Sequence, residues 1–343
     1  MKEENNKGKE QDENLYKEFL KGTKQELKSN YSIPEKEQRK IVNRSKNTAR
    51  TTSVMVSLAL ILLIIPITTL LSYNYYGFHG KADKLIDITG KTLYVTEPNT
   101  SLEEMEIEHE IGFFSMEIFF NTYKRIGKED YKAGDYSIYF ALDKPNFPKE
   151  KSNLDRPLTT PLIENERLLH PQANIPFNIK DEWEMLAGLP EGTVSEVYVS
   201  FTDVMEPKQL EKLVPSTMEV RWLAIDTGLE EKQVDHEGVP VSAIGYPAQY
   251  DPTTWSPFKS QDQTNVEVFI DILKLLEKNE EVAEQISRHK SLELKERLNY
   301  IETNGINVYG AVITGPTSEI LKLKEMQQVR AIKVGEVKLW NWK

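Results

Sequence analysis

The chain of 343 residues contains no cysteine. Cysteine supplies disulfide bridges, thiolate nucleophiles and the sulfur ligands of many metal sites. The sequence therefore excludes disulfide-stabilised folds, cysteine-dependent catalysis and sulfur-ligated metal centres.

Catalytic signatures are also missing. The five histidines are scattered, and there is no H-E-x-x-H helix, G-x-S-x-G elbow, G-x-G-x-x-G turn or P-loop. The segment Ser256–Lys259 matches the S-x-x-K nucleophile motif, but Pro257 disfavours the required helix and no K-T-G follows. We therefore expect no enzyme activity and no cofactor.

A third absence is charge, because Thr51 to Gly80 contains no Asp, Glu, Lys or Arg. About twenty apolar residues in a helix cross a hydrocarbon core of about 30 Å. Signal peptides start near the first residue, and buried helices of soluble proteins are seldom uncharged for so long. The sequence thus predicts one transmembrane helix over 51–80, with a tolerated proline kink and an interfacial tyrosine. Its expected core positions are Val54, Leu58, Leu62, Pro66, Leu70 and Tyr73.

The charges that flank this span predict its orientation. Residues 36–50 contain six basic side chains and one acid, whereas the other side begins with the mixed charges of 81–84. By the positive-inside rule the N-terminus is cytoplasmic and the C-terminal region is extracytoplasmic. We therefore expect a single-pass protein of the cell membrane.

The net charge of −11 divides into +4 over residues 1–50 and −15 over residues 81–343. An acidic outer region repels nucleic acid and anionic headgroups, so nucleic acid is not an expected partner. The basic segment before the span favours anionic lipid of the bilayer instead.

The cytoplasmic tail, residues 1–31, has one apolar cluster. Leu15, Tyr16, Phe19 and Leu20 fall at i, i+1, i+4 and i+5, which places them on one side of a short helix that Gly22 would end. So short a helix needs a partner to be stable, and the alternative is a disordered tail.

A second helix is predicted over the basic juxtamembrane segment, residues 32–50. Ser32 and Glu35 have the spacing of a capping box, with Pro34 in the first turn. We expect this helix to continue into the membrane as one rod.

Residues 81–143 are predicted to be β-rich. Aromatic and β-branched runs of strand length occur at 90–97, 113–126 and 134–142. Between them four glutamates alternate, and they would share one face of a strand. Such a face could collect Ca²⁺, but a solvated face that discourages edge pairing is the favoured interpretation. These glutamates are Glu104, Glu106, Glu108 and Glu110.

Residues 144–178 form a proline-containing linker or irregular connection, and 179–343 alternate helix and strand. A strand, a proline-opened helix and a strand occur at 197–225 and again at 308–332. Two such units form a ferredoxin-like split βαβ sandwich when their strands interleave, and a doubly wound α/β sheet is the alternative. Trp340 and Trp342 would share a face of the last strand, where we expect core packing.

Three C-terminal segments resemble the signature blocks of the sigma factor regulator family, namely 189–198, 304–317 and 334–342. The segment from Ser32 to Gly80, with its S-x-P-E-K start and Tyr-Tyr-Gly exit, is similar to the membrane-proximal part of membrane-bound anti-sigma factors of the Bacillus sigma-M regulator type. The resemblance covers residues 32–342.

The resemblance implies an anti-sigma factor that holds an extracytoplasmic-function sigma factor in the cytoplasm and responds to an envelope signal. Leu15, Tyr16, Phe19 and Leu20 are then the expected sigma-binding residues. The alternative is a membrane-anchored envelope sensor that acts through a small partner membrane protein, without direct sigma binding.

Overall fold

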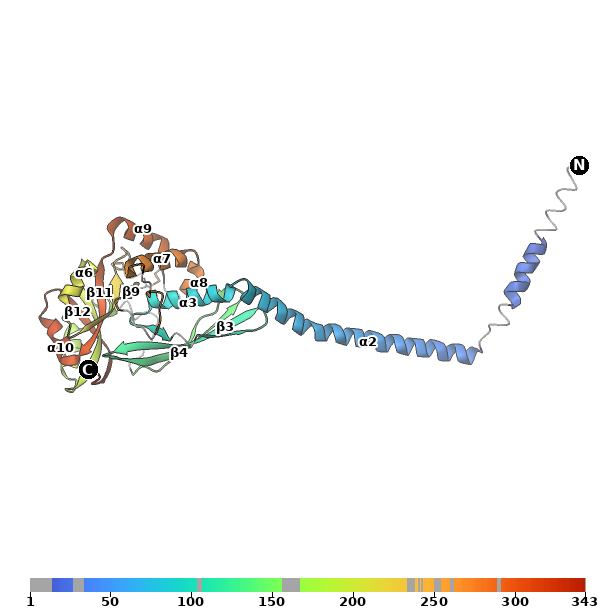
Figure 1. Cartoon of the computed structure of the whole chain (residues 1–343), viewed down its shortest axis with the longest axis horizontal. Coiled ribbons are helices and arrows are strands. Elements are labelled where there is room, and N and C mark those ends of the chain that lie inside the picture. The colour runs from blue at the N-terminus through green and yellow to red at the C-terminus, as the bar shows by residue number, and fades with distance from the viewer. Residues whose placement is uncertain are drawn as a thin grey trace, which may run out of the picture. The chain divides into compact units, whose positions relative to one another are not determined.

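The computed structural model describes residues 14–26, 34–103, 107–155, 167–232, 238–239, 241, 243–249, 254–259, 262–288 and 291–342. The chain divides into two compact units, residues 1–67 and residues 68–343. The second unit contains both the predicted membrane-proximal region and the predicted C-terminal region, which pack as one body (Figure 1).

Residues 14–26 form a helix, which we call the tail helix. The predicted stop at Gly22 is wrong, because the helix continues to Glu26. A glycine inside a helix costs only about 1 kcal/mol relative to alanine, so it lowers stability without forcing an end. The capping residue Ser32 lies outside the described residues.

The long helix α2 runs from Glu35 to Tyr73 and passes through Pro66 without a break. It confirms that the basic segment and the apolar span are one helix. Among the described residues, one helical stretch, Glu35–Phe78, is long and apolar enough to cross a membrane. No part of its most apolar segment is buried in the protein. A core helix would be buried, so the chain is a single-pass membrane protein with an α+β domain.

Two helical elements follow α2 within the second unit. A short π-helix, Asn74–Phe78, leads through Gly80 into α3 (Lys81–Thr96). The predicted strand at 90–97 is wrong, because these residues form the end of α3. Leu85, Ile88 and Thr92 recur at helical spacing and are buried, so packing outweighs the β-propensity of Thr and Val.

A seven-stranded antiparallel sheet packs beside α3, with the path β10-β1-β3-β4-β5; β2 also pairs with β3, and β6 with β4. Its long central strands are β3 (Ser115–Ile126) and β4 (Glu129–Ala141), which confirm the predicted strands at 113–126 and 134–142. Residues alternate between buried and partly exposed along β3, because one face of the strand meets the core. The other strands are β1 (Ser101–Glu103), β2 (Glu108–Ile111), β5 (Lys144–Pro145), β6 (Lys149–Ser152) and β10 (Thr254–Trp255).

A second, five-stranded sheet has the order β12-β7-β11-β8-β9. Every neighbouring pair is antiparallel, so the alternative of a doubly wound parallel sheet is wrong. All of β11 and most of β7 are buried, as expected for central strands covered on both faces. The strands are β7 (Thr193–Met205), β8 (Glu219–Ile225), β9 (Gly245–Pro247), β11 (Val308–Pro316) and β12 (Val329–Leu339).

Helices complete the second unit in the positions that the sequence pattern predicts. Pro207 opens α6, and Gly305 follows α9 with a positive φ of 75°, which a glycine adopts without strain. They are α5 (Ile179–Ala187), α6 (Pro207–Leu213), α7 (Asn265–Glu277), α8 (Glu280–Ile286), α9 (Leu294–Asn304), α10 (Thr317–Ile320) and the 3₁₀ turn η2 (Leu321–Glu325).

Trp340 does not pack in the core, contrary to expectation. β12 ends at Leu339, and the Trp340 side chain is 50% exposed. Lys128 Nζ lies 4.3 Å from the ring centroid of Trp342, so that ring meets a cation. The sequence pattern predicts that Trp340 and Trp342 share one face of the last strand, but β12 ends before both tryptophans.

Candidate functional site

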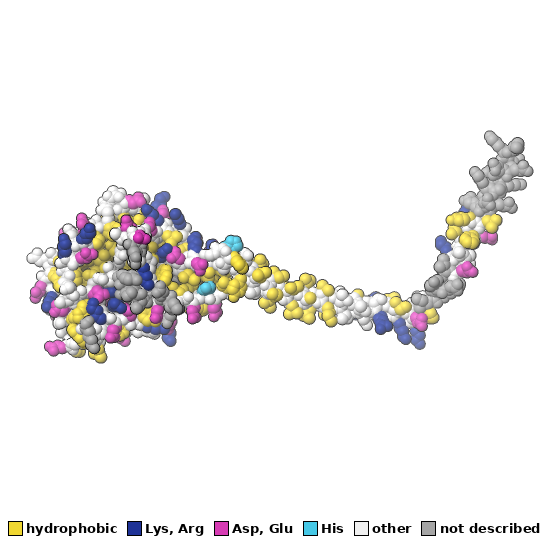
Figure 2. All heavy atoms as spheres, in the orientation of Figure 1, with side chains coloured by type: hydrophobic (Ala, Val, Ile, Leu, Met, Phe, Trp, Pro, Cys, Tyr) yellow, Lys and Arg dark blue, Asp and Glu magenta, His cyan; other side chains and the backbone are white. Residues whose placement is uncertain are grey.

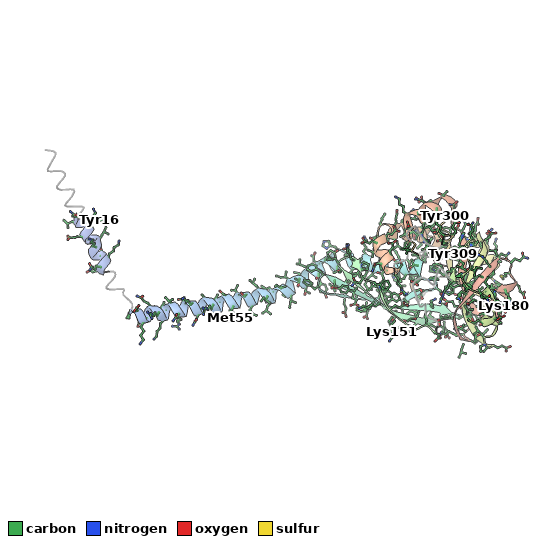
Figure 3. All side chains as sticks on the ribbon, turned by 180° about the vertical axis from the view of Figure 1, so that it is seen from behind. Tyr16, Met55, Lys151, Lys180, Tyr300 and Tyr309 are labelled. Atoms are coloured by element: carbon green, nitrogen blue, oxygen red, sulfur yellow. The ribbon has the colours of Figure 1, made fainter. Side chains whose placement is uncertain are left out.

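The four predicted sigma-binding side chains all project from the tail helix into solvent. Their exposed fractions are 66% for Leu15, 64% for Tyr16, 68% for Phe19 and 44% for Leu20. Figure 3 labels Tyr16 on this helix, and hydrophobic side chains gather there in Figure 2. Because burying one such side chain is worth about 1.5–3 kcal/mol, this face can bind an apolar groove.

The predicted core positions of the span are also exposed along α2. Val54, Leu58, Leu62, Leu70 and Tyr73 are at least half exposed, and Pro66 is exposed too. The arrangement suits lipid contact, because apolar side chains lie around the helix rather than against a protein core.

The end of α2 and the π-helix that follows it are hydrogen-bonded to two loops of the first sheet. The buried Oγ of Ser72 accepts a 2.8 Å bond from the backbone N–H of Phe114, just before β3. The hydroxyl of Tyr76, a residue that is fully buried, donates a 2.7 Å bond to the carbonyl of Leu142, just after β4. The start of β3 and the end of β4 lie together at the open end of the β3–β4 hairpin. The helix end is thus fixed to both of these strands.

Far along the hairpin, a buried ion pair joins the two sheets. Lys124 Nζ on β3 lies 3.1 Å from Glu196 Oε1 on β7, and the side chains are 8% and 0% exposed. Lys124 also donates to the hydroxyl of Tyr198, at 2.8 Å. Glu196 accepts from Asn99 Nδ2 at 2.7 Å and from the backbone N–H of Glu336 at 3.2 Å. We call Lys124, Glu196, Tyr198 and Asn99 the bridging cluster.

The bridging cluster keeps both charges at neutral pH. Burial opposes the charged form of each residue, but the neighbouring opposite charge and the hydrogen bonds together outweigh it. The pKa of Lys124 is therefore raised by the carboxylate of Glu196 and the hydrogen bond to Tyr198. The pKa of Glu196 is lowered by Lys124 and by the hydrogen bond from Asn99.

The β3–β4 turn is also fastened to the second sheet. The N–H of Gly127 donates to Thr314 Oγ1 on β11 at 2.7 Å. Asn341 accepts from the N–H of Lys128 and donates to the carbonyl of Ile126. The hairpin therefore links the end of α2, at one end, to the C-terminal sheet, at the other.

Sequence reasoning missed this connection, although β3 carries a signal of it. Lys124 falls on the same strand face as the buried Ile118 and Phe120, where a lysine is out of place unless it is paired. Glu196 is likewise a charged residue in the buried, largely apolar part of β7, where it needs a partner. The Ser72 and Tyr76 bonds have no such signal, because both residues fit an ordinary membrane-exit sequence.

Two weak motifs found in the sequence do not form sites among the described residues. Glu108 and Glu110 are exposed on β2, while Glu104 and Glu106 lie outside the described residues. No group of three or more possible metal ligands occurs in the part of the chain that the structure describes. Ser256 Oγ accepts from the N–H of Phe258 in a turn, so S-x-x-K is not on a helix.

Comparison with known proteins gives two family matches and one curated relative. Residues 39–131 match the sigma factor regulator N-terminal family, and residues 186–336 match the sigma factor regulator C-terminal family. The probable anti-sigma-M factor YhdL of Bacillus subtilis (strain 168) is 30% identical over 316 residues, which cover 91% of this chain and 86% of that protein. No solved structure matches significantly.

Proposed function

Because this chain belongs to the sigma factor regulator family of anti-sigma factors, which regulate a sigma factor negatively, we propose that its tail helix binds the sigma factor directly. The observation that carries this proposal is the exposed apolar face of Leu15, Tyr16, Phe19 and Leu20. A helix with such a face and no covering segment in the described residues is suited to a groove on a partner.

The partner is an extracytoplasmic-function sigma factor, and its site lies on the cytoplasmic side. The curated relative is described as an anti-sigma-M factor, which supports a sigma factor of that type here. The basic residues of α2 before the span support a cytoplasmic N-terminus by the positive-inside rule. The second unit is then extracytoplasmic, and it senses the envelope signal.

We further assign the second sheet, with α6 and α10, to the ferredoxin-like class. Strands β7 and β8 flank α6, and strands β11 and β12 flank α10. The order β12-β7-β11-β8 interleaves the strands of these two units, which supports a split βαβ arrangement. The segment from β9 to α9 is an insertion between the two units.

Binding of the tail is tested with the full chain in lipid nanodiscs and a purified sigma factor of the sigma-M type. Replacing Leu15 and Phe19 by Asp removes two apolar anchors and places charges in the contact, so we expect at least about a 100-fold weaker Kd. The matched control replaces Asn14 and Gln25 by Asp on the opposite helix face, and it binds normally. Equal Kd values for the two double variants contradict the proposal.

A second candidate function is action through a small partner membrane protein. One face of α2, just before and at the start of the span, carries small residues at helical spacing, which allow a second helix to approach closely. They are Ser45, Thr48, Ala49, Thr52 and Ser53. Deleting residues 2–30 separates the two functions, because only direct binding predicts that sigma-dependent transcription rises after this deletion.

A further inference from the structure

Exposed hydrophobic side chains concentrate at one end of the second unit. Nine large ones are exposed among its described residues after Tyr73, and five of them belong to the π-helix after α2, to the start of the β3–β4 hairpin or to residues 139–147 at its end. Figure 2 shows hydrophobic side chains gathered there. Those five are Phe78, Phe113, Tyr139, Leu142 and Phe147.

Three of these residues lie on the π-helix that follows α2 or in the two loops that are hydrogen-bonded to the helix end, and we call them the rim. Phe78 is 81% exposed, Phe113 is 68% exposed and Leu142 is 43% exposed. Phe113 precedes the residue that bonds to Ser72, and Leu142 accepts from Tyr76. The N–H of Leu142 also donates to the carbonyl of Phe114 at 3.0 Å, which ties the two loops together.

The two loops that carry Phe113 and Leu142 each contain a residue in an unusual backbone conformation. Phe114 has a φ of 46° and Leu142 has a φ of 58°, a region that large side chains rarely adopt. Such strain persists only where the surroundings fix it, and here both residues lie in the loops that bond to Ser72 and Tyr76. The rim is thus a built surface rather than a few incidental exposed residues.

The depth of the rim follows from the length of the span. Arg50 is the last charge before the span, and the 22 helical residues from there to Ser72 rise about 33 Å, which is close to the hydrocarbon thickness. Ser72 therefore lies at the border of the hydrocarbon. Since the N–H of Phe114 is 2.8 Å from Ser72 Oγ, the loop that carries Phe113 lies at the same level.

We propose that the rim of Phe78, Phe113 and Leu142 inserts into the interface of the bilayer and seats the second unit on the membrane surface. Aromatic side chains favour this zone. The attraction is apolar, because residues 81–343 carry a net charge of −15, which opposes attraction to anionic lipid. The proposal does not rest on sigma binding by the tail.

The absence of cysteine makes a direct test possible. A spin label is attached to Phe113→Cys in the full chain, reconstituted in nanodiscs of zwitterionic phosphatidylcholine. Oxygen concentrates in lipid and a polar nickel chelate in water, so their relative access to the label reports its depth. The matched control is Leu339→Cys, because Leu339 is 82% exposed and lies at the end of β12.

We expect the ratio of oxygen to nickel access at position 113 to exceed that at position 339 several-fold. Phe78→Cys gives the same result if the first variant folds poorly. Equal ratios at 113 and 339 overturn the proposal, since the rim then faces water. Shielding of position 113 from both reagents also overturns it, because a second copy of the chain then covers the rim.

Discussion

Lys124 Nζ on β3 lies 3.1 Å from Glu196 Oε1 on β7, and the contact is closed to solvent. The two residues are 72 positions apart in the chain and belong to different sheets. Because β3 begins at the loop that bonds to the end of α2, this pair lies on a continuous path from the membrane helix to the C-terminal sheet.

Replacing Lys124 by Met leaves the Glu196 carboxylate buried without its counter-charge. We expect a loss of about 3–5 kcal/mol in the free energy of unfolding, measured by denaturant unfolding in nanodiscs. Adding Glu196→Gln should restore part of that loss, because the remaining charge is removed. A double variant that loses the sum of both single effects contradicts the coupling.

The same pair sets a pH window for stability. The pKa of Glu196 is lowered in the folded chain, so its contribution is full above the unfolded carboxyl pKa of about 4.3 and is lost as pH falls through the folded pKa. The pKa of Lys124 is raised, so its contribution is full below about 10.4 and is lost as pH rises further.

The difference in melting temperature between the wild type and Lys124→Met/Glu196→Gln measures this window. It should be constant from about pH 5 to pH 10 and shrink at more acidic pH. A difference that changes steeply near neutral pH would assign the effect to another group.

Gly335 is predicted to tolerate no side chain. A Cβ at this position would lie 2.4 Å from Glu196 Oε2, so Gly335→Ala must displace the carboxylate from the bridging cluster. We expect destabilisation of about 1–3 kcal/mol, as for loss of a buried hydrogen-bond partner. Gly77→Ala is the control for added side-chain bulk, because no atom lies within 4 Å of its Cβ.

Ser72→Ala tests the connection between α2 and the first sheet. It removes the acceptor of the Phe114 N–H, which costs about 1 kcal/mol or more for this partly buried bond. Amide exchange at Phe114 should quicken, while exchange in β7 stays unchanged. Unaltered exchange at Phe114 shows that the loop is held by its own conformation.

Gly22→Ala tests the tail helix itself. Alanine favours a helix interior by about 1 kcal/mol over glycine, so the tail should become more helical and bind the sigma factor about fivefold more tightly. Gly22→Pro should have the opposite effect, since proline breaks a helix interior. Kd values from calorimetry check both changes, and equal affinities argue against a helical bound state.

Much of the fold could be predicted where local patterns agree with packing. The uncharged run from Thr51 and the alternation of β3 and β4 predict a span and two strands. The prediction of a strand at 90–97 is wrong because β-branched residues also occur in helices when their spacing matches a buried face, as in α3. Helix termination at Gly22 was wrong because glycine weakens a helix without ending it.

The long-range contacts could not be predicted from one sequence. Lys124 and Glu196 each look anomalous on a buried strand face, but nothing local indicates that they pair with each other. Ser72 contacts Phe114 only because the π-helix and α3 return the chain beside β3. By contrast, the apolar cluster of the tail was found directly, because its four residues lie within a single helix.

The central claim is that the tail helix is the sigma-binding element, and hydrogen–deuterium exchange tests it most directly. The full chain in nanodiscs is compared with and without a sigma factor of the sigma-M type. We predict slower exchange across residues 14–26 in the complex, and none of this protection in Leu15→Asp/Phe19→Asp. Unchanged exchange across 14–26 in a complex that has demonstrably formed would contradict direct binding by the tail.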